Sequence, residues 1–89
     1  MANGEAQQIV PSVLLVDDRH ENLLALEGVL KPLGARLVKA RSGEDALLYL
    51  LRETFAVILL DVQMPRLDGL QTAQLIKQRE QTRHIPIIF

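Results

Sequence analysis

The sequence predicts an α/β domain built on a parallel β-sheet with helices on both faces. Four short apolar segments alternate with three segments in which apolar residues recur at helical spacing, so the predicted order is β-α-β-α-β-α-β. The chain has 89 residues, 48% of them hydrophobic and 24% charged, which suits one small globular domain. In such sheets the functional crevice lies outside the carboxyl ends of the strands.

Each predicted strand is a short apolar run bounded by polar or turn residues. The segment FAVILLD is apolar on consecutive positions, so this strand is expected to be covered on both faces. The segment ARLVKA alternates instead, which places Leu37 on one face and Val38 on the other. Pro86 is tolerable near the start of the last strand. The predicted strands are residues 12–18, 35–40, 55–61 and 84–89.

Each predicted helix combines an apolar stripe with a recognisable start or stop. The first ends at Gly34, and Pro32 is expected to bend or fray its last turn. The second follows Ser42 as N-cap, and the third begins at Asp68 or Gly69. The residues expected to point inward are Leu23, Leu26, Leu30 and Leu33 in the first helix, Ala46, Leu47, Leu50 and Leu51 in the second, and Leu70, Ala73 and Ile76 in the third.

Net charge and cysteine content exclude several classes of function. The formal net charge is −1 with mixed signs, so there is no electrostatic basis for binding nucleic acid or an anionic membrane. The absence of cysteine excludes disulfides, thiolate nucleophiles and cysteine-ligated metals. Residues 1–11 are expected to be a disordered leader without a secretory pattern, and no apolar run is long enough to span a bilayer. We therefore expect a cytoplasmic protein.

Three aspartates stand where predicted strands end: Asp17 and Asp18 after the first, and Asp61 after the third. If those strands are neighbours, the carboxylates converge at one sheet edge, where a bound cation would relieve their repulsion. Oxygen-only ligands favour a hard ion, and Mg²⁺ fits best. A carboxylate left partly free can attack phosphorus and form an acyl phosphate. Asp17 or Asp18 alone would more simply be a helix N-cap, the role assigned to Asp68, but three acids at one edge favour the cation site.

The segments LLVDD and ILLDVQMPRLDG resemble the receiver domain of bacterial two-component response regulators. The pattern D-x-x-M-P-x-x-D-G after an apolar strand is specific, and the resemblance covers residues 12–89. It implies that Asp61 is the phosphoacceptor, that Asp17 and Asp18 bind Mg²⁺, and that the backbone carbonyl of Gln63 is a further metal ligand. It also implies a flavodoxin-like (CheY-like) sheet of order 2-1-3-4-5, of which this sequence holds about four strands and three helices of the usual five and five.

The resemblance further implies a reaction and its partners. The phosphoryl donor would be a phosphohistidine on a sensor histidine kinase or on a histidine phosphotransfer domain, and the receiver would promote its own phosphorylation and dephosphorylation. The segments DDRHENLLALEGVL and RHIPIIF resemble in particular receivers that are fused to, or work with, histidine kinases. Pro65 and Gly69 are similar to the residues that shape the loop after the site, and the Gln63 side chain lies where the family tunes loss of the phosphoryl group.

Measured against the family, the sequence stops at Phe89, near the end of the fourth strand. The family's Ser or Thr after that strand and its Lys after the fifth strand have no counterpart, and neither Lys39 nor Lys77 replaces the lysine. We therefore expect residues 12–89 to be the N-terminal portion of a receiver, lacking the last strand and last two helices, with the cation ligands intact and a defective switch. The fourth strand would be an open edge that invites self-association.

Other functions stay open at this point. A degenerate receiver could act only as a protein-docking module, although the intact acids count against it. A haloacid-dehalogenase-type phosphatase would need a general acid two residues after its nucleophile, where this chain has Gln63. A flavin- or nucleotide-binding domain would carry a glycine-rich loop after the first strand, and this sequence has none. Near the site, His20 and Arg66 are expected to be solvated, and Met64 to pack beneath the loop.

Overall fold

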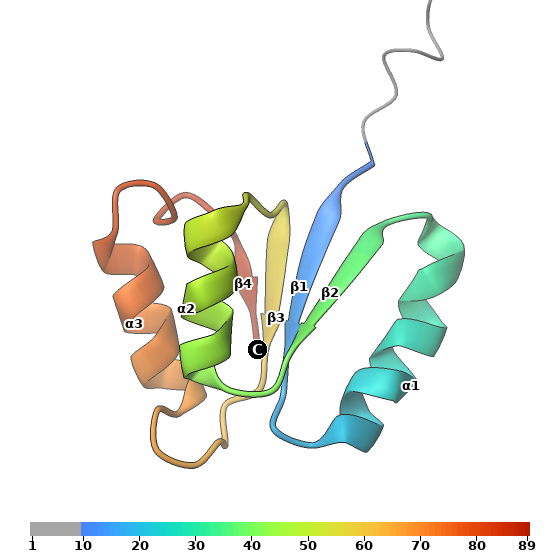
Figure 1. The fold of residues 1–89 in the computed structure, drawn as a ribbon, viewed down its shortest axis with the longest axis horizontal. Helices are drawn as coiled ribbons and strands as arrows, with labels where there is room; N and C mark the ends of the chain where they lie inside the picture. Colours follow the sequence, from blue (N-terminus) through green and yellow to red (C-terminus); the bar gives the residue numbers. More distant parts are fainter. Residues whose placement is uncertain (1–9) are drawn as a thin grey trace, which may run out of the picture.

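The computed structural model describes residues 10–89, so residues 1–9 of the predicted leader lie outside the described residues. Four parallel strands form a sheet of order β2-β1-β3-β4, with α1 on one face and α2 and α3 on the other (Figure 1). The predicted α/β fold and its order of elements are confirmed. The elements are β1 (Ser12–Val16), α1 (His20–Leu30), the 3₁₀ turn η2 (Lys31–Leu33), β2 (Arg36–Ala40), α2 (Gly43–Arg52), β3 (Val57–Leu60), α3 (Gly69–Gln78) and β4 (Ile87–Ile88).

The register of the sheet brings three strand ends level with one another. Val16, the last residue of β1, pairs with Ala40 at the end of β2 and with Leu60 at the end of β3. The strands are parallel, so the residues that follow each of them emerge at the same edge, at the bottom of Figure 1. This register decides which side chains meet at the functional edge.

The core consists of two apolar layers, one on each face of the sheet, because successive strand residues point to opposite sides. Leu14 and Val16 of β1 pack in the larger layer with α2 and α3, whereas Leu15 packs in the smaller layer with α1. Val38 joins the larger layer and Leu37 the smaller one, as their alternation predicted.

The two helices on the larger layer approach each other closely at Gly43 and Thr72. A Cβ atom on Gly43 would lie 2.2 Å from Oγ1 of Thr72, so a larger residue there would force the two helices or the Thr72 side chain to move. The Thr72 side chain is fully buried, and its hydroxyl donates a hydrogen bond of 2.7 Å to the carbonyl of Asp68. A polar residue therefore occupies an inward position of α3 at little cost, because its hydroxyl is satisfied by its own helix.

Three leucines expected to point inward are exposed, which corrects the helical stripes predicted from the sequence. Leu33 is 75% exposed because Pro32 lies in a 3₁₀ turn, which ends at Gly34 with a φ of 79° and changes the helical period. Leu51 is 60% exposed, because Ala46, Leu47 and Leu50 form the side of α2 that packs in the larger core layer. Leu70 is 54% exposed, because α3 turns Thr72 toward the core instead.

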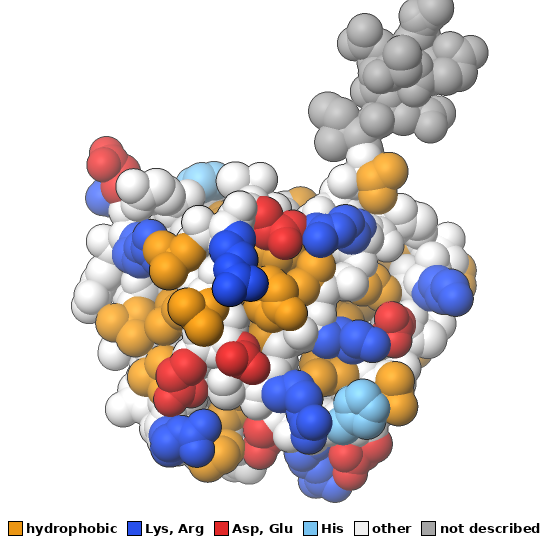
Figure 2. All heavy atoms as spheres, viewed as in Figure 1, with side chains coloured by type: hydrophobic (Ala, Val, Ile, Leu, Met, Phe, Trp, Pro, Cys, Tyr) orange, Lys and Arg blue, Asp and Glu red, His pale blue; other side chains and the backbone are white. Residues whose placement is uncertain are grey.

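Coverage of β3 on both faces is confirmed only in part. Ile58 and Leu60 are buried under α2 and α3, but Val57 and Leu59 on the α1 side are only half-buried. None of the helices in residues 10–89 combines the length and apolar character that a membrane span needs. The surface in Figure 2 carries acidic and basic side chains interspersed, in line with the near-zero net charge.

Candidate functional site

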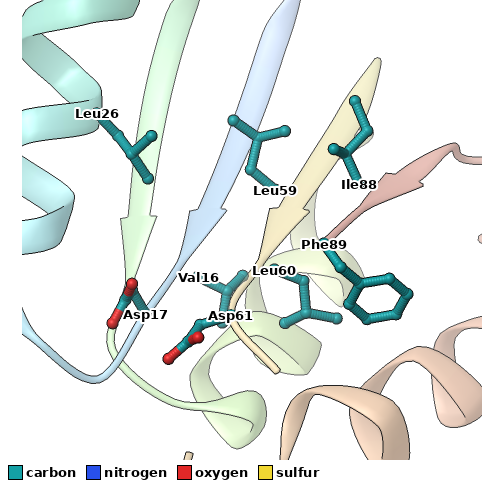
Figure 3. Close-up of a pocket in the computed structure, with 8 residues that line it drawn as sticks. All are labelled: Val16, Asp17, Leu26, Leu59, Leu60, Asp61, Ile88 and Phe89. Atoms are coloured by element: carbon teal, nitrogen blue, oxygen red, sulfur yellow. The ribbon is translucent and has the colours of Figure 1, made fainter. Parts of the chain in front are cut away.

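Three carboxylates gather at the carboxyl edge of the sheet. Asp17, Asp18 and Asp61 each place one oxygen so that all three oxygens lie within 4.8 Å of one another. Figure 3 shows the Asp17 and Asp61 side chains at the ends of their strands, with the Asp61 carboxylate extending toward Asp17. The predicted convergence of these acids, far apart in the sequence, is confirmed.

Backbone hydrogen bonds that continue the sheet fix the positions of two of these acids. The N–H of Asp61 donates to the carbonyl of Val16 over 2.9 Å, and the N–H of Asp17 donates to the carbonyl of Ala40 over 3.1 Å. Each aspartate is therefore the first residue beyond its strand, still held by the ladder. A side chain anchored in this way is placed more accurately than one on a free loop.

Asp17 is the most enclosed of the three acids, with 7% of its surface exposed. Its Oδ1 accepts a hydrogen bond of 3.0 Å from the backbone N–H of Arg19. Its Oδ2 accepts one of 3.1 Å from the side-chain amide of Asn22, on the first turn of α1. Sequence reasoning missed Asn22; its spacing of five residues from Asp17 at a strand-to-helix turn was the available signal.

Asp61 is half-buried and begins the loop that connects β3 to α3. Its Oδ1 lies 3.4 Å from the backbone nitrogen of Gln63, which donates to it. Met64 is 8% exposed and packs in the larger core layer beneath this loop, as predicted. The loop closes where the N–H of Gly69 donates to the carbonyl of Val62 over 2.9 Å. The exposed Gln63 itself lies on the solvent side of the loop, and a ligand role for its carbonyl stays a prediction.

No basic side chain in residues 10–89 forms an ion pair with any of the three aspartates. Arg19, which follows Asp18 in the sequence, pairs with Glu21 at 3.3 Å instead. The pKa of Glu21 lies below its usual range, because its backbone N–H and then Arg19 donate hydrogen bonds to the carboxylate. The charge of the cluster is therefore not balanced by a side chain of this part of the protein.

The donor set fits a hard divalent cation. The three oxygens lie within 4.8 Å of one another and carry like charges, so the carboxylates repel one another until a cation binds between them. Neighbouring ligand oxygens on one Mg²⁺ lie about 3 Å apart and opposite ones about 4.2 Å apart, so the carboxylates would draw together around a bound ion. The cluster offers oxygen atoms alone, which is the ligand chemistry that Mg²⁺ prefers.

Other residues considered from the sequence lie away from the cluster or have structural roles. Asp68 is a helix cap, as predicted: its Oδ1 accepts from the N–H of Gln71 over 2.8 Å, and the Gln71 side chain accepts from the N–H of Asp68. Lys39 pairs with Glu27 at 3.0 Å, and Lys77 donates to backbone carbonyls near β4. His20 and Arg66 are exposed, as expected.

A cavity of about 300 Å³ adjoins the cluster on the α1 side of the sheet. Its walls are apolar apart from Asp17 and Asp61, which stand at one end (Figure 3). The half-buried Leu59 and the exposed residues Ile88 and Phe89 also line it.

Comparison with known sequences identifies the family. The profile of the response regulator receiver domain matches residues 13–89. The chain is 40% identical over 81 residues to the sensor histidine kinase GacS of Pseudomonas protegens, covering 88% of this chain and 9% of that protein. It is 32% identical over 77 residues to the polar-differentiation response regulator DivK of Brucella ovis, covering 86% of this chain and 63% of DivK.

Solved structures agree with this assignment. The N-terminal domain of a response regulator receiver protein from Methanoculleus marisnigri has a TM-score of 0.84 and 33% identity, over 89% of this chain and 64% of that one. The response regulator TrrA of Thermotoga maritima, solved in complex with Mg²⁺-BeF, has a TM-score of 0.76 and 28% identity, over 80% of this chain and 62% of that one. With the sheet order 2-1-3-4 and the acidic cluster at the carboxyl edge, the chain belongs to the receiver domains of two-component response regulators.

Proposed function

We propose that residues 12–89 act as a phosphoacceptor receiver, in which Asp61 takes a phosphoryl group in the presence of Mg²⁺. The observation that carries this proposal is the gathering of Asp17, Asp18 and Asp61 within 4.8 Å, with no basic side chain of residues 10–89 paired to them. Asp61 is the acid on the exposed loop after β3, which gives an incoming phosphoryl group access to it.

In the proposed site, Asp17 and Asp18 hold the cation together with Asp61 and the backbone carbonyl of Gln63. When bound, Mg²⁺ neutralises the carboxylates and the charge that develops on the phosphoryl oxygens during transfer. TrrA, a relative at 28% identity, was solved with Mg²⁺-BeF, which supports this assignment. The two hydrogen bonds to Asp17 keep its carboxylate in place, so that the more exposed Asp61 is the acid free to react.

The proposed reaction is nucleophilic displacement at phosphorus. An Asp61 carboxylate oxygen forms a bond to the phosphorus of a phosphohistidine while the phosphorus–nitrogen bond breaks, and the departing imidazole nitrogen takes the electron pair and a proton from water. The product is a mixed anhydride on Asp61. Water can attack the same phosphorus later and restore the carboxylate, so the domain promotes both its own phosphorylation and its dephosphorylation.

The proposed donor is a sensor histidine kinase or a histidine phosphotransfer domain. Similarity to the histidine kinase GacS, of which this chain spans 9%, supports a receiver that works with or within a hybrid kinase. Similarity to DivK supports a separate regulator equally well. Because histidine kinases draw phosphoryl groups from ATP, we place the reaction in the cytoplasm.

The test uses a small phosphoryl donor. The chain is incubated with acetyl phosphate and Mg²⁺ and its mass is measured intact. We expect a phosphoryl adduct that hydroxylamine removes, that requires Mg²⁺, and that is absent in Asp61→Asn. The control is Asp68→Asn, which changes a nearby aspartate that caps a helix and is expected to keep the adduct.

Absence of an adduct on the wild-type chain, with Mg²⁺ binding intact, would contradict the phosphoacceptor role and favour a receiver that only docks to partners. An adduct that persists in Asp61→Asn would show that another residue reacts. A repeat with a phosphorylated histidine phosphotransfer domain as donor tests the proposed partner directly.

A further inference from the structure

Asn22 ties the start of α1 to the buried carboxylate at the end of β1. Its side-chain amide donates to Oδ2 of Asp17 over 3.1 Å, while the backbone N–H of Arg19 donates to Oδ1 over 3.0 Å. We propose that Asn22 is a positioning residue, which holds the Asp17 carboxylate in the orientation that Mg²⁺ requires. The proposal rests on the proposed function, because it concerns the same metal site.

The hydrogen bonds leave part of the carboxylate available. An ionised carboxylate accepts at about four lone-pair positions on its two oxygens, and the two donors occupy one position on each. Both oxygens are thus fixed, so the plane of the carboxylate cannot rotate freely. The remaining lone pairs stay available to the cluster with Asp18 and Asp61. Side chains that hydrogen-bond to metal ligands in this way commonly strengthen metal binding without touching the ion.

The chemistry of Asn22 suits this role because its amide is a neutral donor. A lysine or arginine at the same place would hold Asp17 equally well but would repel a divalent cation. The one cationic side chain at this turn, Arg19, is 66% exposed and pairs with Glu21 instead. The arrangement therefore orders Asp17 without reducing the negative charge of the cluster.

A purely structural role for the same hydrogen bond makes a different prediction. If Asn22 only fastens α1 to β1, its removal lowers stability but affects all cations alike. If it orients Asp17, the effect depends on the ion. Mg²⁺ demands near-ideal octahedral geometry, whereas Ca²⁺ accepts flexible coordination by more ligands. The ratio of Mg²⁺ affinity to Ca²⁺ affinity therefore distinguishes a role of Asn22 in orienting Asp17 from a purely structural role.

The experiment measures Mg²⁺ and Ca²⁺ dissociation constants by calorimetry for the wild type, Asn22→Ala, and the control Gln74→Ala. Gln74 is an exposed residue on α3, so Gln74→Ala removes a side-chain amide, as Asn22→Ala does, but at a position away from the site. We expect Asn22→Ala to weaken Mg²⁺ binding about tenfold and Ca²⁺ binding less than about twofold. Gln74→Ala is expected to change neither. Circular dichroism without metal checks that each variant is folded.

A double-mutant cycle with Asp17→Ala makes the test independent of stability. Once Asp17 is absent, Asn22→Ala is expected to cause no further loss of Mg²⁺ affinity, because the group that it positions is gone. Equal losses for both ions, no loss for either, or an undiminished effect in the Asp17→Ala background would each overturn the proposal. A wild-type chain that binds no Mg²⁺ would instead refute the proposed function itself, so the two failures are distinguishable.

Discussion

Gly69 lies against the backbone of Asp61, so closely that a Cβ atom on Gly69 would stand 2.1 Å from the Asp61 carbonyl oxygen. The same Cβ would lie 2.7 Å from the Cα of Val62. The first residue of α3 is thus in direct contact with the backbone that carries the proposed phosphoacceptor. Backbone atoms cannot move aside as a flexible side chain can, so any residue larger than glycine must displace the loop.

Replacing Gly69 by alanine is expected to impair both folding and phosphorylation. The added methyl group forces a backbone shift, which lowers the free energy of unfolding by about 1–3 kcal/mol. The shift also moves Asp61 relative to Asp17 and Asp18, so the adduct should form more slowly. Urea unfolding and adduct formation measure the two effects. Gly28→Ala is the matched control: its Cβ meets nothing within 4 Å, so it should stabilise α1 by about 0.5–1 kcal/mol.

Removing one charge from the cluster is expected to have opposite effects without and with Mg²⁺. Asp18→Asn leaves the hydrogen bonds of Asp17 and Asp61 in place but removes repulsion between carboxylates. Without metal, the variant should therefore melt at a higher temperature than the wild type. At a Mg²⁺ concentration about 100 times the dissociation constant, the wild type should gain about 2.7 kcal/mol and become the more stable protein. Thermal unfolding in EDTA and in Mg²⁺ shows which of the two proteins is the more stable in each condition. If Asp18→Asn remains the more stable protein in Mg²⁺, this result contradicts a shared cation site.

Asp68 is expected to matter for stability and not for metal binding. Its carboxylate caps α3 through the N–H of Gln71, and asparagine can make the same hydrogen bond without the charge. Asp68→Asn should therefore keep both stability and Mg²⁺ affinity. Asp68→Ala should lose about 1 kcal/mol of stability and still bind Mg²⁺. A drop in Mg²⁺ affinity in Asp68→Asn, measured by calorimetry, would mean that Asp68 belongs to the cation site.

In a protein that consists of residues 1–89 alone, the outer edge of β4 is expected to mediate self-association. Within residues 10–89 this strand pairs only with β3, and Ile88 and Phe89 are 56% and 60% exposed. Sedimentation velocity over a wide concentration range should show larger species, which Ile88→Lys reduces, because a charge on an edge strand opposes strand pairing. Leu33→Lys is the control, since Leu33 is equally apolar and 75% exposed but lies after α1. A wild-type chain that stays monomeric at high concentration contradicts this prediction.

The sequence by itself determined the elements and their order. Alternation in ARLVKA and continuous apolarity in FAVILLD are local patterns, and the resulting strands lie where they were predicted. Ser42 and Asp68 cap their helices as expected, because a cap depends only on the next few residues. The acids at the strand ends could likewise be found, since a charge that ends an apolar run is visible in the sequence.

Only the tertiary structure decided which of these elements meet. The position of β1 between β2 and β3, which brings Asp17 and Asp61 together, was implied by the resemblance to receivers but by no local pattern, because it follows from packing between segments far apart in the chain. The hydrogen bond from Asn22 to Asp17 and the contact of Gly69 with Asp61 depend on the directions in which α1 and α3 follow their strands. Helical periodicity likewise cannot reveal that a close approach to Gly43 turns Thr72 inward and leaves Leu70 exposed. Periodicity encodes the conformation of a segment, whereas contacts between segments depend on the shapes of both partners.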